Sequence, residues 1–245
     1  MDRNFELLQR IGASIRMDVS RETYDQFRIY KGLLKEWNER INLTAITDDD
    51  EIFLKHFADS ISIFRLDVVQ QARTVIDVGT GAGFPGLPMK ILKKELQLTL
   101  LDPLNKRLTF LKEVGKELGL TEIEYIHGRA EDVSRETSQR DHYDLAVSRA
   151  VAVLPTLMEY CLPFVKPQGH FVAMKGPGID AELGLNRQLA SDLSARFIKV
   201  EPVTDLDDFE HNLVLFQKSK PTATKYPRKN VQIKKDNERY RAKLS

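Results

Sequence analysis

The chain has 245 residues, of which 42% are hydrophobic and 30% are charged, and it contains a single cysteine. This length allows a sizeable core, and the composition excludes collagen-like, disordered and disulfide-rich classes of protein. One cysteine cannot form an internal disulfide, the apolar runs are too short to cross a bilayer, and the first ten residues lack the apolar segment of a signal peptide. We therefore expect a cytoplasmic protein with no membrane partner.

The net charge of +1 is unevenly distributed along the chain. Residues 218–245 contain 10 Lys and Arg against 2 acidic residues, a net charge of +8. Subtraction leaves 27 basic and 34 acidic residues in 1–217, a net charge of −7. A basic tail on a mildly acidic body is typical of chains that bind polyanions. A solvated tail that only aids solubility has the same composition, so the charge alone does not separate these two interpretations.

Residues 1–65 are predicted to be helical. Apolar side chains between Tyr24 and Ile41 recur at intervals of three and four residues, which indicates one long amphipathic helix. Ser20 stands at the N-cap position of this helix, and Glu22 lies in its first turn. After a turn near Thr44 a second amphipathic segment follows. We therefore expect an N-terminal helical extension.

From residue 73 onward, short apolar strand candidates alternate with helical stretches, a pattern typical of a parallel sheet. The predicted strand and helix pairs are 74–78 with 87–96, 97–101 with 104–118, 123–126 with a short helix near Ala130, 143–148 with 154–164, and 170–175 with 182–193. Two further strands, 197–203 and 212–218, are joined by a polar connection only, which predicts an antiparallel hairpin at the edge of the sheet.

The predicted fold class is therefore α/β. We expect a Rossmann-like, seven-stranded, mostly parallel sheet with an antiparallel C-terminal edge hairpin, preceded by the N-terminal helical extension. The expected units are the extension at 1–65, the sheet domain at 66–217 and the basic tail at 218–245, in which no sustained periodicity is visible. Right-handed crossovers place the loops after the first, second and fourth strands along one edge of the sheet.

A glycine-rich loop directly follows the first predicted strand and reads Gly79-Thr-Gly-Ala-Gly-Phe-Pro-Gly. The alternating glycines Gly79, Gly81 and Gly83 allow a sharp turn and leave room for a ligand against the backbone, next to the N–H groups that open the following helix. The loop also satisfies the dinucleotide fingerprint, which is a weak signal on its own. A P-loop is excluded, because no Gly-Lys-Ser/Thr follows.

Two acidic residues flank this loop in the predicted fold. Asp102 closes the second strand, where a carboxylate can accept both hydroxyls of a ribose, a contact shared by NAD and adenosyl ligands. Asp77 precedes the first glycine by two residues and favours a cationic ligand with an amine and a sulfonium over a diphosphate. We therefore place S-adenosylmethionine ahead of NAD as the cofactor.

The segment Asp77-Val-Gly-Thr-Gly-Ala-Gly-Phe-Pro-Gly resembles motif I of the class I methyltransferases. In this proline-bearing form it is similar to the bacterial ribosomal RNA small subunit methyltransferase G family, also called glucose-inhibited division protein B. Further landmarks of that family follow in order, and the resemblance covers roughly residues 24–229. These landmarks are Trp37-Asn-Glu-Arg-Ile-Asn-Leu-Thr-Ala-Ile, Lys55-His-Phe-Ala-Asp-Ser-Ile, Asp102-Pro-Leu-Asn-Lys-Arg, Gly128-Arg-Ala-Glu-Asp, Ser148-Arg-Ala-Val-Ala and Lys225-Tyr-Pro-Arg-Lys.

The resemblance implies transfer of a methyl group from S-adenosylmethionine to N7 of a guanine in 16S ribosomal RNA, either naked or in the small ribosomal subunit. The implied cofactor contacts are Gly79, Phe84, Asp102, Pro103, Leu104, Ala130, Glu131 and Arg149. The tail departs from the family pattern after Lys229, because it reads Asn230-Val-Gln-Ile where the family continues with Gly, Pro and Lys. How this tail contacts RNA is therefore left open.

The residues after the fourth strand bear on the target atom. Methylation of an exocyclic amine uses an Asn/Asp-Pro-Pro-aromatic motif there, whereas this chain has Ser148-Arg-Ala-Val. Methylation of a pyrimidine C5 needs a thiolate, and Cys161 lies in an apolar helical stretch where a small buried side chain is expected. Guanine N7 has an exposed lone pair, so in-line transfer without a covalent intermediate needs mainly alignment. Other ring-nitrogen or oxygen targets are also compatible.

Arg149 is the candidate catalytic residue, at the expected open end of the fourth strand between cofactor and substrate. It can donate to guanine O6, to a phosphate or to the cofactor, or form a salt bridge with a carboxylate at the edge of the sheet. His56 and Asp59 lie three residues apart on a predicted helix, and we interpret them as joining the N-terminal helices to the sheet. Phe84 either packs on the cofactor or fills the core beneath it.

The tail supplies the candidate RNA contacts, because its basic residues can bind phosphates and its Tyr226 and Tyr240 offer stacking faces. The predicted contacts are Lys225, Arg228, Lys229, Lys234 and Lys235. We expect no metal, since no cluster has the spacing of metal ligands, and we expect a monomer. The alternatives are a class I methyltransferase acting on a small molecule or protein, a non-catalytic RNA-binding assembly module and, third, a NAD-dependent oxidoreductase.

Overall fold

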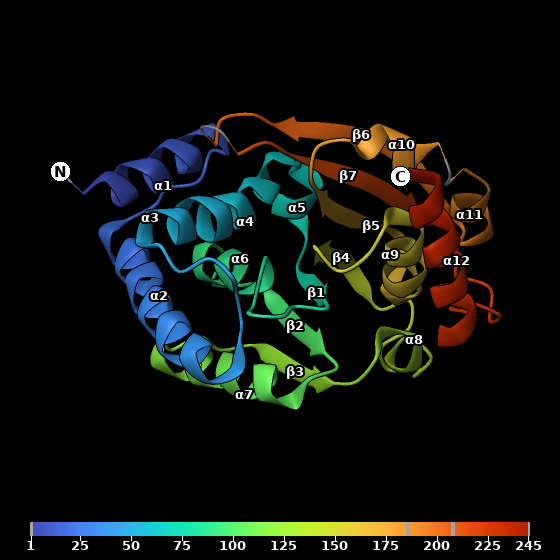
Figure 1. The fold of residues 1–245 in the computed structure, drawn as a ribbon, viewed down its shortest axis with the longest axis horizontal. Helices are drawn as coiled ribbons and strands as arrows, with labels where there is room; N and C mark the ends of the chain where they lie inside the picture. The colour runs from blue at the N-terminus through green and yellow to red at the C-terminus, as the bar shows by residue number, and fades with distance from the viewer. Residues whose placement is uncertain (1, 185–186, 207–208, 245) are drawn as a thin grey trace.

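The alternation of strands and helices predicted from residue 73 onward produces one sheet. The computed structural model describes residues 2–184, 187–206 and 209–244, and in these ranges seven strands pair in the order β3-β2-β1-β4-β5-β7-β6 (Figure 1). Strands β1 to β5 are parallel, and β7 runs antiparallel to both β5 and β6. The strands are β1 (Thr74–Val78), β2 (Gln97–Asp102), β3 (Ile123–His127), β4 (Tyr143–Arg149), β5 (Val165–Lys175), β6 (Ala195–Val203) and β7 (His211–Lys218).

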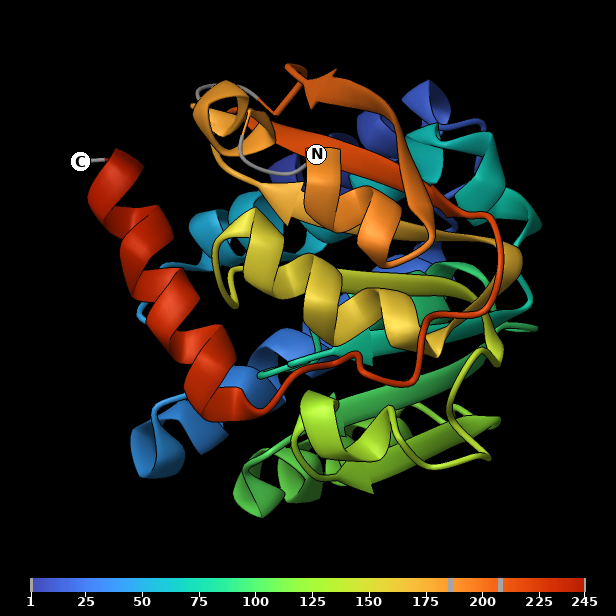
Figure 2. The same cartoon turned by 90° about the vertical axis from the view of Figure 1, so that its right-hand side faces the viewer.

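Helices cover both faces of this sheet. The N-terminal helices pack on α6 and α7 on one face, whereas α9 packs on β4 and β5 and is contacted by α8, α10 and α12 on the other (Figures 1 and 2). The first group comprises α1 (Arg3–Ser14), α2 (Arg21–Ile41), α3 (Asp49–Ile52), the π-helix η1 (Phe53–Ala58), α4 (Asp59–Ile61), the 3-10 helix η2 (Ser62–Arg65), α5 (Asp67–Gln71), α6 (Gly86–Leu92) and α7 (Asn105–Glu117). The second comprises α8 (Ala130–Val133), α9 (Leu154–Cys161), the 3-10 helix η3 (Leu162–Phe164), α10 (Ile179–Leu183), α11 (Arg187–Asp192) and α12 (Asn230–Leu244).

Helix α2 shows why the N-terminal segment folds onto the sheet. Ser20 caps it, since its side-chain oxygen accepts a hydrogen bond from the backbone N–H of Thr23 at 3.1 Å. The predicted apolar stripe is buried, including Phe27, Tyr30 and Leu34, each 0% exposed. These side chains belong to the same hydrophobic core as apolar residues of β1 and β2. The N-terminal helices therefore cover one face of the sheet and share its core.

The predicted elements and the structure differ in four places. The helical N-terminal segment is interrupted by a loop around residues 16–20, in addition to the predicted turn near Thr44. Strand β5 begins at Val165, five residues before the predicted 170–175, and the predicted helix 182–193 is divided into α10 and α11. In the tail, where no periodicity was visible, α12 spans Asn230–Leu244. The described part of α12 buries mainly Ile233, so an apolar stripe to signal the helix is lacking there.

Lys218 ends β7 inside the protein, although the sequence places it at the start of a basic tail. Its side chain is 0% exposed, and Nζ donates to Asp141 Oδ1 at 2.8 Å and to the carbonyls of Leu162 at 2.8 Å and Val165 at 2.9 Å. Burial lowers its pKa, although the nearby carboxylate of Asp141 acts in the opposite direction. This lysine therefore joins β7 to the start of η3 and the start of β5.

We expect Lys218→Met to lower the free energy of unfolding by about 3 kcal/mol, because Asp141 and two carbonyl oxygens lose their buried partner. Lys220→Met is the matched control, since Lys220 is exposed, and it should change stability by less than about 0.5 kcal/mol. Urea unfolding followed by circular dichroism measures both. Equal stability of the two variants would contradict a structural role for Lys218.

Candidate cofactor and substrate site

The loops at the carboxyl ends of the parallel strands bring the predicted cofactor residues to one edge of the sheet. The glycine loop follows β1, Asp102 ends β2, Ala130 follows β3 and Arg149 ends β4. These strands are direct neighbours in the order β3-β2-β1-β4 (Figure 1). In open α/β sheets this edge is where ligands bind, so the predicted residues lie where a cofactor is expected.

The glycine loop adopts a conformation that only glycine adopts without strain. Gly79, Gly81 and Gly83 have φ angles of 74°, 61° and 97°, all in the left-handed region. The backbone N–H of Gly79 donates to the carbonyl of Leu101 at 2.9 Å, which holds the loop against β2. A Cβ on Gly79 would lie 2.7 Å from Val151 Cγ2, so the loop after β4 also packs closely on it. The loop is thus fixed by both neighbouring strands.

Asp77 shapes the glycine loop from beneath. Its side chain is 0% exposed, and Oδ2 accepts from Thr80 Oγ1 at 2.7 Å and from the backbone N–H of Gly86 at 2.9 Å. Burial raises the pKa of Asp77 to about 6. The hydrogen bonds of Oδ2 hold the two ends of the loop together, whereas Oδ1 is a buried oxygen that accepts no hydrogen bond within the protein. The expectation that this carboxylate faces a cationic ligand stays a prediction.

Asp102 is also turned into the protein. It is 0% exposed, and Oδ2 accepts from the N–H of Gly81 at 3.0 Å while Oδ1 accepts from the N–H of Leu104 at 2.8 Å. Arg107 Nη1 lies 3.3 Å from Oδ2. The carboxylate therefore ties the loop after β1 to the loop after β2. Contact with the hydroxyls of a ribose, as predicted, requires exchange of at least one of these bonds.

The segment after β3 provides a polar group suited to a ligand. Glu131 is 7% exposed, and its Oε1 is a buried oxygen that accepts no hydrogen bond within the protein, although Arg129 Nη1 lies 3.9 Å from it. Nearby, Leu104 is 42% exposed and offers an apolar side chain, and Pro103 is fixed because its carbonyl lies 3.0 Å from His127 Nε2. A buried acceptor beside an exposed apolar side chain fits an adenosyl group, which has amine and hydroxyl donors and a flat apolar ring.

Phe84 fills the core beneath the loop. It is 5% exposed, its ring stacks on that of His56 with centroids 4.5 Å apart, and it also stacks on Tyr30 with centroids 5.5 Å apart. The Tyr30 hydroxyl donates to the carbonyl of Ala82 within the loop. Of the two expected roles for Phe84, the structure therefore shows the packing role, and aromatic side chains of α2 and η1 support the glycine loop.

Arg149 points toward the N-terminal helices. Its Nη1 donates to Asp59 Oδ2 at 2.6 Å and to the carbonyl of Lys55 at 3.0 Å, and its Cζ lies 4.8 Å from the centroid of the Phe84 ring. The side chain is 15% exposed. The salt bridge considered as the alternative is therefore present, and its partner is Asp59. The spacing of His56 and Asp59 indicated a link between helices and sheet, but nothing in it identified Arg149 as the other end.

His56 completes the surroundings of the guanidinium. Its Nδ1 lies 3.3 Å from Arg149 Nη2, and its Nε2 lies 2.8 Å from Thr44 Oγ1. Nδ1 also lies 3.2 Å from the carbonyl oxygen of Lys55, so it faces both a donor and an acceptor. Burial, together with the charge of Arg149, lowers the pKa of His56 to about 4. His56 is therefore neutral at pH 7.

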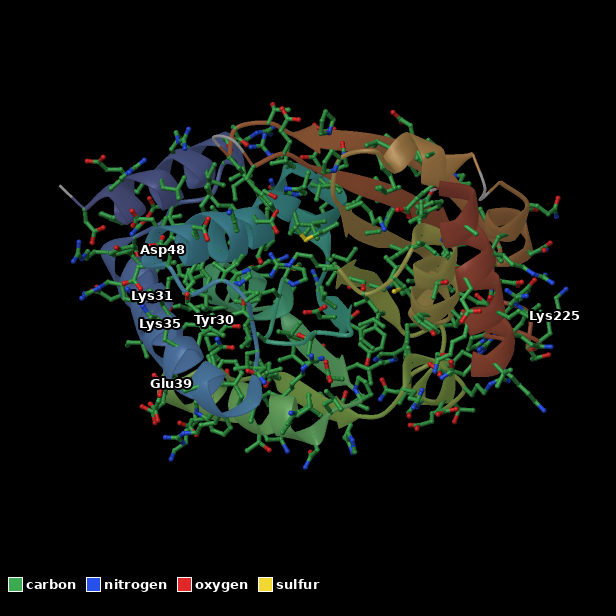
Figure 3. All side chains as sticks on the ribbon, in the orientation of Figure 1. Tyr30, Lys31, Lys35, Glu39, Asp48 and Lys225 are labelled. Atoms are coloured by element: carbon green, nitrogen blue, oxygen red, sulfur yellow. The ribbon has the colours of Figure 1, made fainter. Side chains whose placement is uncertain are left out.

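Four of the predicted RNA contacts are exposed, whereas the fifth binds acidic side chains of the protein itself. Lys225, Lys229, Lys234 and Lys235 are exposed, and Lys225 lies at one end of the molecule in Figure 3. Arg228 is a correction: its Nη2 and Nε donate to Glu159 Oε1 at 2.8 Å and Oε2 at 2.9 Å, and its Nη1 donates to Asp236 at 2.7 Å. Glu159 is 1% exposed, so Arg228 anchors the start of α12 to α9.

Tyr226 is a second correction in the tail. It is 6% exposed, and its hydroxyl donates to Asp192 at 3.4 Å, so its ring is not a stacking face for RNA. The side chain of Tyr240 lies outside the described residues. The backbone before α12 is fixed as well, because Arg140 Nη2 donates to the carbonyl of Thr222 at 2.8 Å and Arg135 donates to that of Pro227.

Helix α12 lies next to the cofactor edge. A hollow of about 490 Å³ separates α8, which follows β3, from the start of α12. It is lined by Arg129, Glu131, Asp132, Arg135, Arg228, Lys229 and Asn230. Figure 2 shows that α12 is the outermost element at one side of the molecule. Lys234 and Lys235 on this helix are exposed. The exposed tail lysines therefore lie beside the segment that carries Glu131.

The described ranges contain neither a metal-binding cluster nor a membrane-spanning helix. No group of three or more His, Cys, Asp and Glu side chains there has an arrangement that could hold a metal ion. Within the same parts of the chain, every helix is too short or too polar to span a membrane.

Comparisons with known proteins agree on one family. The family model described as rRNA small subunit methyltransferase G matches residues 23–206. A protein of Clostridium botulinum (strain Loch Maree / Type A3) called ribosomal RNA small subunit methyltransferase G is 47% identical over 236 residues, which are 95% of this chain and 98% of that protein. The protein of the same name from Clostridium perfringens (strain 13 / Type A) is 46% identical over 94% of this chain and 97% of its own length.

Among solved structures, MtNAS in complex with MTA and tNA has a similar fold. Its TM-score is 0.53 at 11% identity, and the match covers 80% of this chain and 73% of that one. At such low identity the likeness concerns the fold alone.

Replacement of Asp77 by asparagine should change how stability depends on pH. The folded protein binds a proton at Asp77 near pH 6, whereas the ordinary pKa of this group is 3.8, so the folded state is protonated first as the pH falls. Between pH 7 and pH 4 the wild type should therefore gain about 2 kcal/mol of stability relative to Asp77→Asn. Urea unfolding at several pH values measures the difference, with the exposed Asp132→Asn as the control. A difference independent of pH would contradict the raised pKa.

Proposed function

The chain belongs to the rRNA small subunit methyltransferase G family, and from this premise we propose that it transfers a methyl group from S-adenosylmethionine to N7 of one guanine in 16S ribosomal RNA. The observation that carries the proposal is the family match over residues 23–206, on a fold whose carboxyl edge combines the glycine loop with the buried Glu131, whose Oε1 accepts no hydrogen bond within the protein. The substrate is the RNA, naked or in the small ribosomal subunit, and a monomer acts on it in the cytoplasm.

The residues at the sheet edge divide the binding of S-adenosylmethionine among them. The backbone of Gly79, Gly81 and Gly83, whose φ angles are left-handed, provides the surface against which the ligand lies. Glu131 accepts from the ligand's amine or hydroxyl groups, and Leu104 packs on its adenine. When bound, S-adenosylmethionine supplies a methyl group activated by a sulfonium.

Methyl transfer to guanine N7 mainly requires the protein to align the two reactants. Guanine N7 attacks with a lone pair that is already free, so no side chain has to remove a proton first. Cys161 is unsuited to act as a nucleophile, because it is buried in the core on α9 and burial raises its pKa well above the ordinary value. Orientation of the reactants supplies about 7–11 kcal/mol of the barrier reduction in well-aligned systems.

Arg149 is the candidate catalytic residue in this scheme. A guanidinium has five N–H donors, and the contacts with Lys55, Asp59 and His56 use three of them. The remaining donors can bind guanine O6 or an RNA phosphate next to the glycine loop. Such a contact fixes the base relative to the methyl group.

The direct test is transfer from labelled S-adenosylmethionine to unmodified small-subunit particles and, in parallel, to naked 16S RNA. We expect one labelled guanine, identified as N7-methylated by mass spectrometry. Glu131→Gln should weaken cofactor binding about tenfold, because it replaces a charge-assisted acceptor. Binding of the cofactor without any labelled RNA would overturn the RNA assignment and favour a small-molecule or protein acceptor. A wild-type chain that does not bind the cofactor would overturn the whole proposal.

Loss of lysines from α12 should weaken RNA binding and make it less dependent on the salt concentration. Lys234→Gln with Lys235→Gln should lower the slope of log affinity against log salt by about 0.7 for each lost phosphate contact. Cofactor affinity should stay unchanged. The matched control is Lys31→Gln with Lys35→Gln, at the opposite end of the molecule in Figure 3, where both lysines pair with Asp49. Equal RNA slopes for the two double variants would contradict a role for α12.

Truncation gives a coarser version of the same test. A chain that ends at Gln217 also loses Lys218 from the core and the Arg228–Glu159 ion pair, so weak RNA binding by it would have two explanations. A chain that ends at Lys229 keeps both contacts and removes only α12. We expect this shorter tail to reduce RNA affinity while the thermal unfolding temperature and cofactor affinity stay close to those of the full chain.

A further inference from the structure

Asp59 lies in a buried row of three charged or titratable side chains. Its Oδ2 accepts from Arg149 Nη1 at 2.6 Å, and its Oδ1 lies 2.7 Å from His211 Nδ1. The side chain of Asp59 is 3% exposed and that of His211 is 4% exposed. The three residues come from α4, β4 and the start of β7, so the row crosses from the N-terminal helices to the sheet.

Within this row, the charges of Asp59 and Arg149 balance each other. Burial opposes ionisation of Asp59, but its bonds to His211 and Arg149 outweigh burial and hold its pKa below the ordinary value. Asp59 is therefore an anion, Arg149 is a cation, and the neighbouring His56 is neutral at pH 7. The ion pair thus has no net charge where it meets the glycine loop.

This balance matters because of the charge that the proposed reaction brings. S-adenosylmethionine has a positive sulfonium, and N7 methylation moves that positive charge onto the guanine ring. The guanidinium of Arg149 lies against Phe84 of the glycine loop, at the edge where both cations have to be held. An uncompensated guanidinium there would repel each of them, and in a partly buried site the repulsion is larger than in water.

We propose that Asp59 is a positioning residue that holds Arg149 at the cofactor edge and neutralises it, so that the site accepts the cationic cofactor beside an arginine. The inference rests on the proposed function. His211 holds the second oxygen of Asp59 and thereby fixes the direction of the first. Ser62 lies behind His211, with its Oγ 3.4 Å from Nε2.

The test compares a cationic ligand with a neutral one at the same site. S-adenosylhomocysteine lacks only the methyl group and the sulfonium charge, so the ratio of its affinity to that of S-adenosylmethionine reports the charge of the site. By calorimetry, Asp59→Asn should weaken S-adenosylmethionine about tenfold more than S-adenosylhomocysteine, the size expected for one lost charge about 12 Å from the sulfonium at an effective dielectric constant of about 20. A purely structural defect would weaken both ligands alike.

The controls separate charge from folding. Asp49→Asn makes the same substitution in the same helical region, where Asp49 pairs with Lys31 and Lys35 at the surface, and should leave the ratio unchanged. Adding Arg149→Met to Asp59→Asn removes the uncompensated cation and should restore the wild-type ratio. If Asp59→Asn does not fold, Arg149→Met alone tests the idea, because it should shift the ratio in favour of S-adenosylmethionine.

Two results would overturn the inference. One is an unchanged affinity ratio in folded Asp59→Asn, and the other is an unchanged ratio in Arg149→Met. Both are distinguishable from failure of the proposed function, in which the wild-type chain would bind neither ligand or would label no RNA.

Discussion

The ion pair between Asp59 and Arg149 is the contact on which the arrangement of the functional edge depends. It joins a residue of the N-terminal helices to the last residue of β4, and the stacked rings of His56, Phe84 and Tyr30 surround it. Because the Tyr30 hydroxyl also binds the carbonyl of Ala82, the same helices fix the glycine loop. The N-terminal helices are therefore part of the site: they set the position of a charged side chain and of a loop that the sheet alone leaves exposed.

The acidic residues of the edge act mainly through backbone N–H groups. Asp77 and Asp102 are both fully buried, and between them they accept from the N–H groups of Gly81, Gly86 and Leu104. Three glycines in left-handed conformations leave N–H groups unpaired by regular structure, and these carboxylates satisfy some of them. A loop held this firmly offers a ligand a preformed backbone surface. Glu131 Oε1 and Asp77 Oδ1 are buried oxygens that accept no hydrogen bond within the protein, which suits both to direct recognition of a ligand.

The sequence was sufficient for the order of strands and helices and for the edge at which the site lies, because both follow from local periodicity and from the handedness of crossovers. It was insufficient for the direction of individual side chains. The sequence did not indicate that Asp77 binds the backbone of its own loop, nor that Arg228, expected to face RNA, binds Glu159, which lies 69 residues away in sequence. Nothing in local spacing reports such long-range pairs, since an exposed and a buried arginine have the same neighbours in sequence.

The long-range pairs also change which charges of the basic tail can contact RNA. Its net charge of +8 counts Lys218, which is fully buried, and Arg228, whose guanidinium binds Glu159 and Asp236. Both residues attach the tail to the body of the protein and are not available to a polyanion. The charge that can meet phosphates lies in residues such as Lys229, Lys234 and Lys235, which are exposed on or just before α12. A tail that is not attached to the body of the protein would spread this charge over a large volume. The Arg228–Glu159 pair instead concentrates it beside the segment that carries Glu131. Placement of the charge, more than its amount, connects the tail to the site.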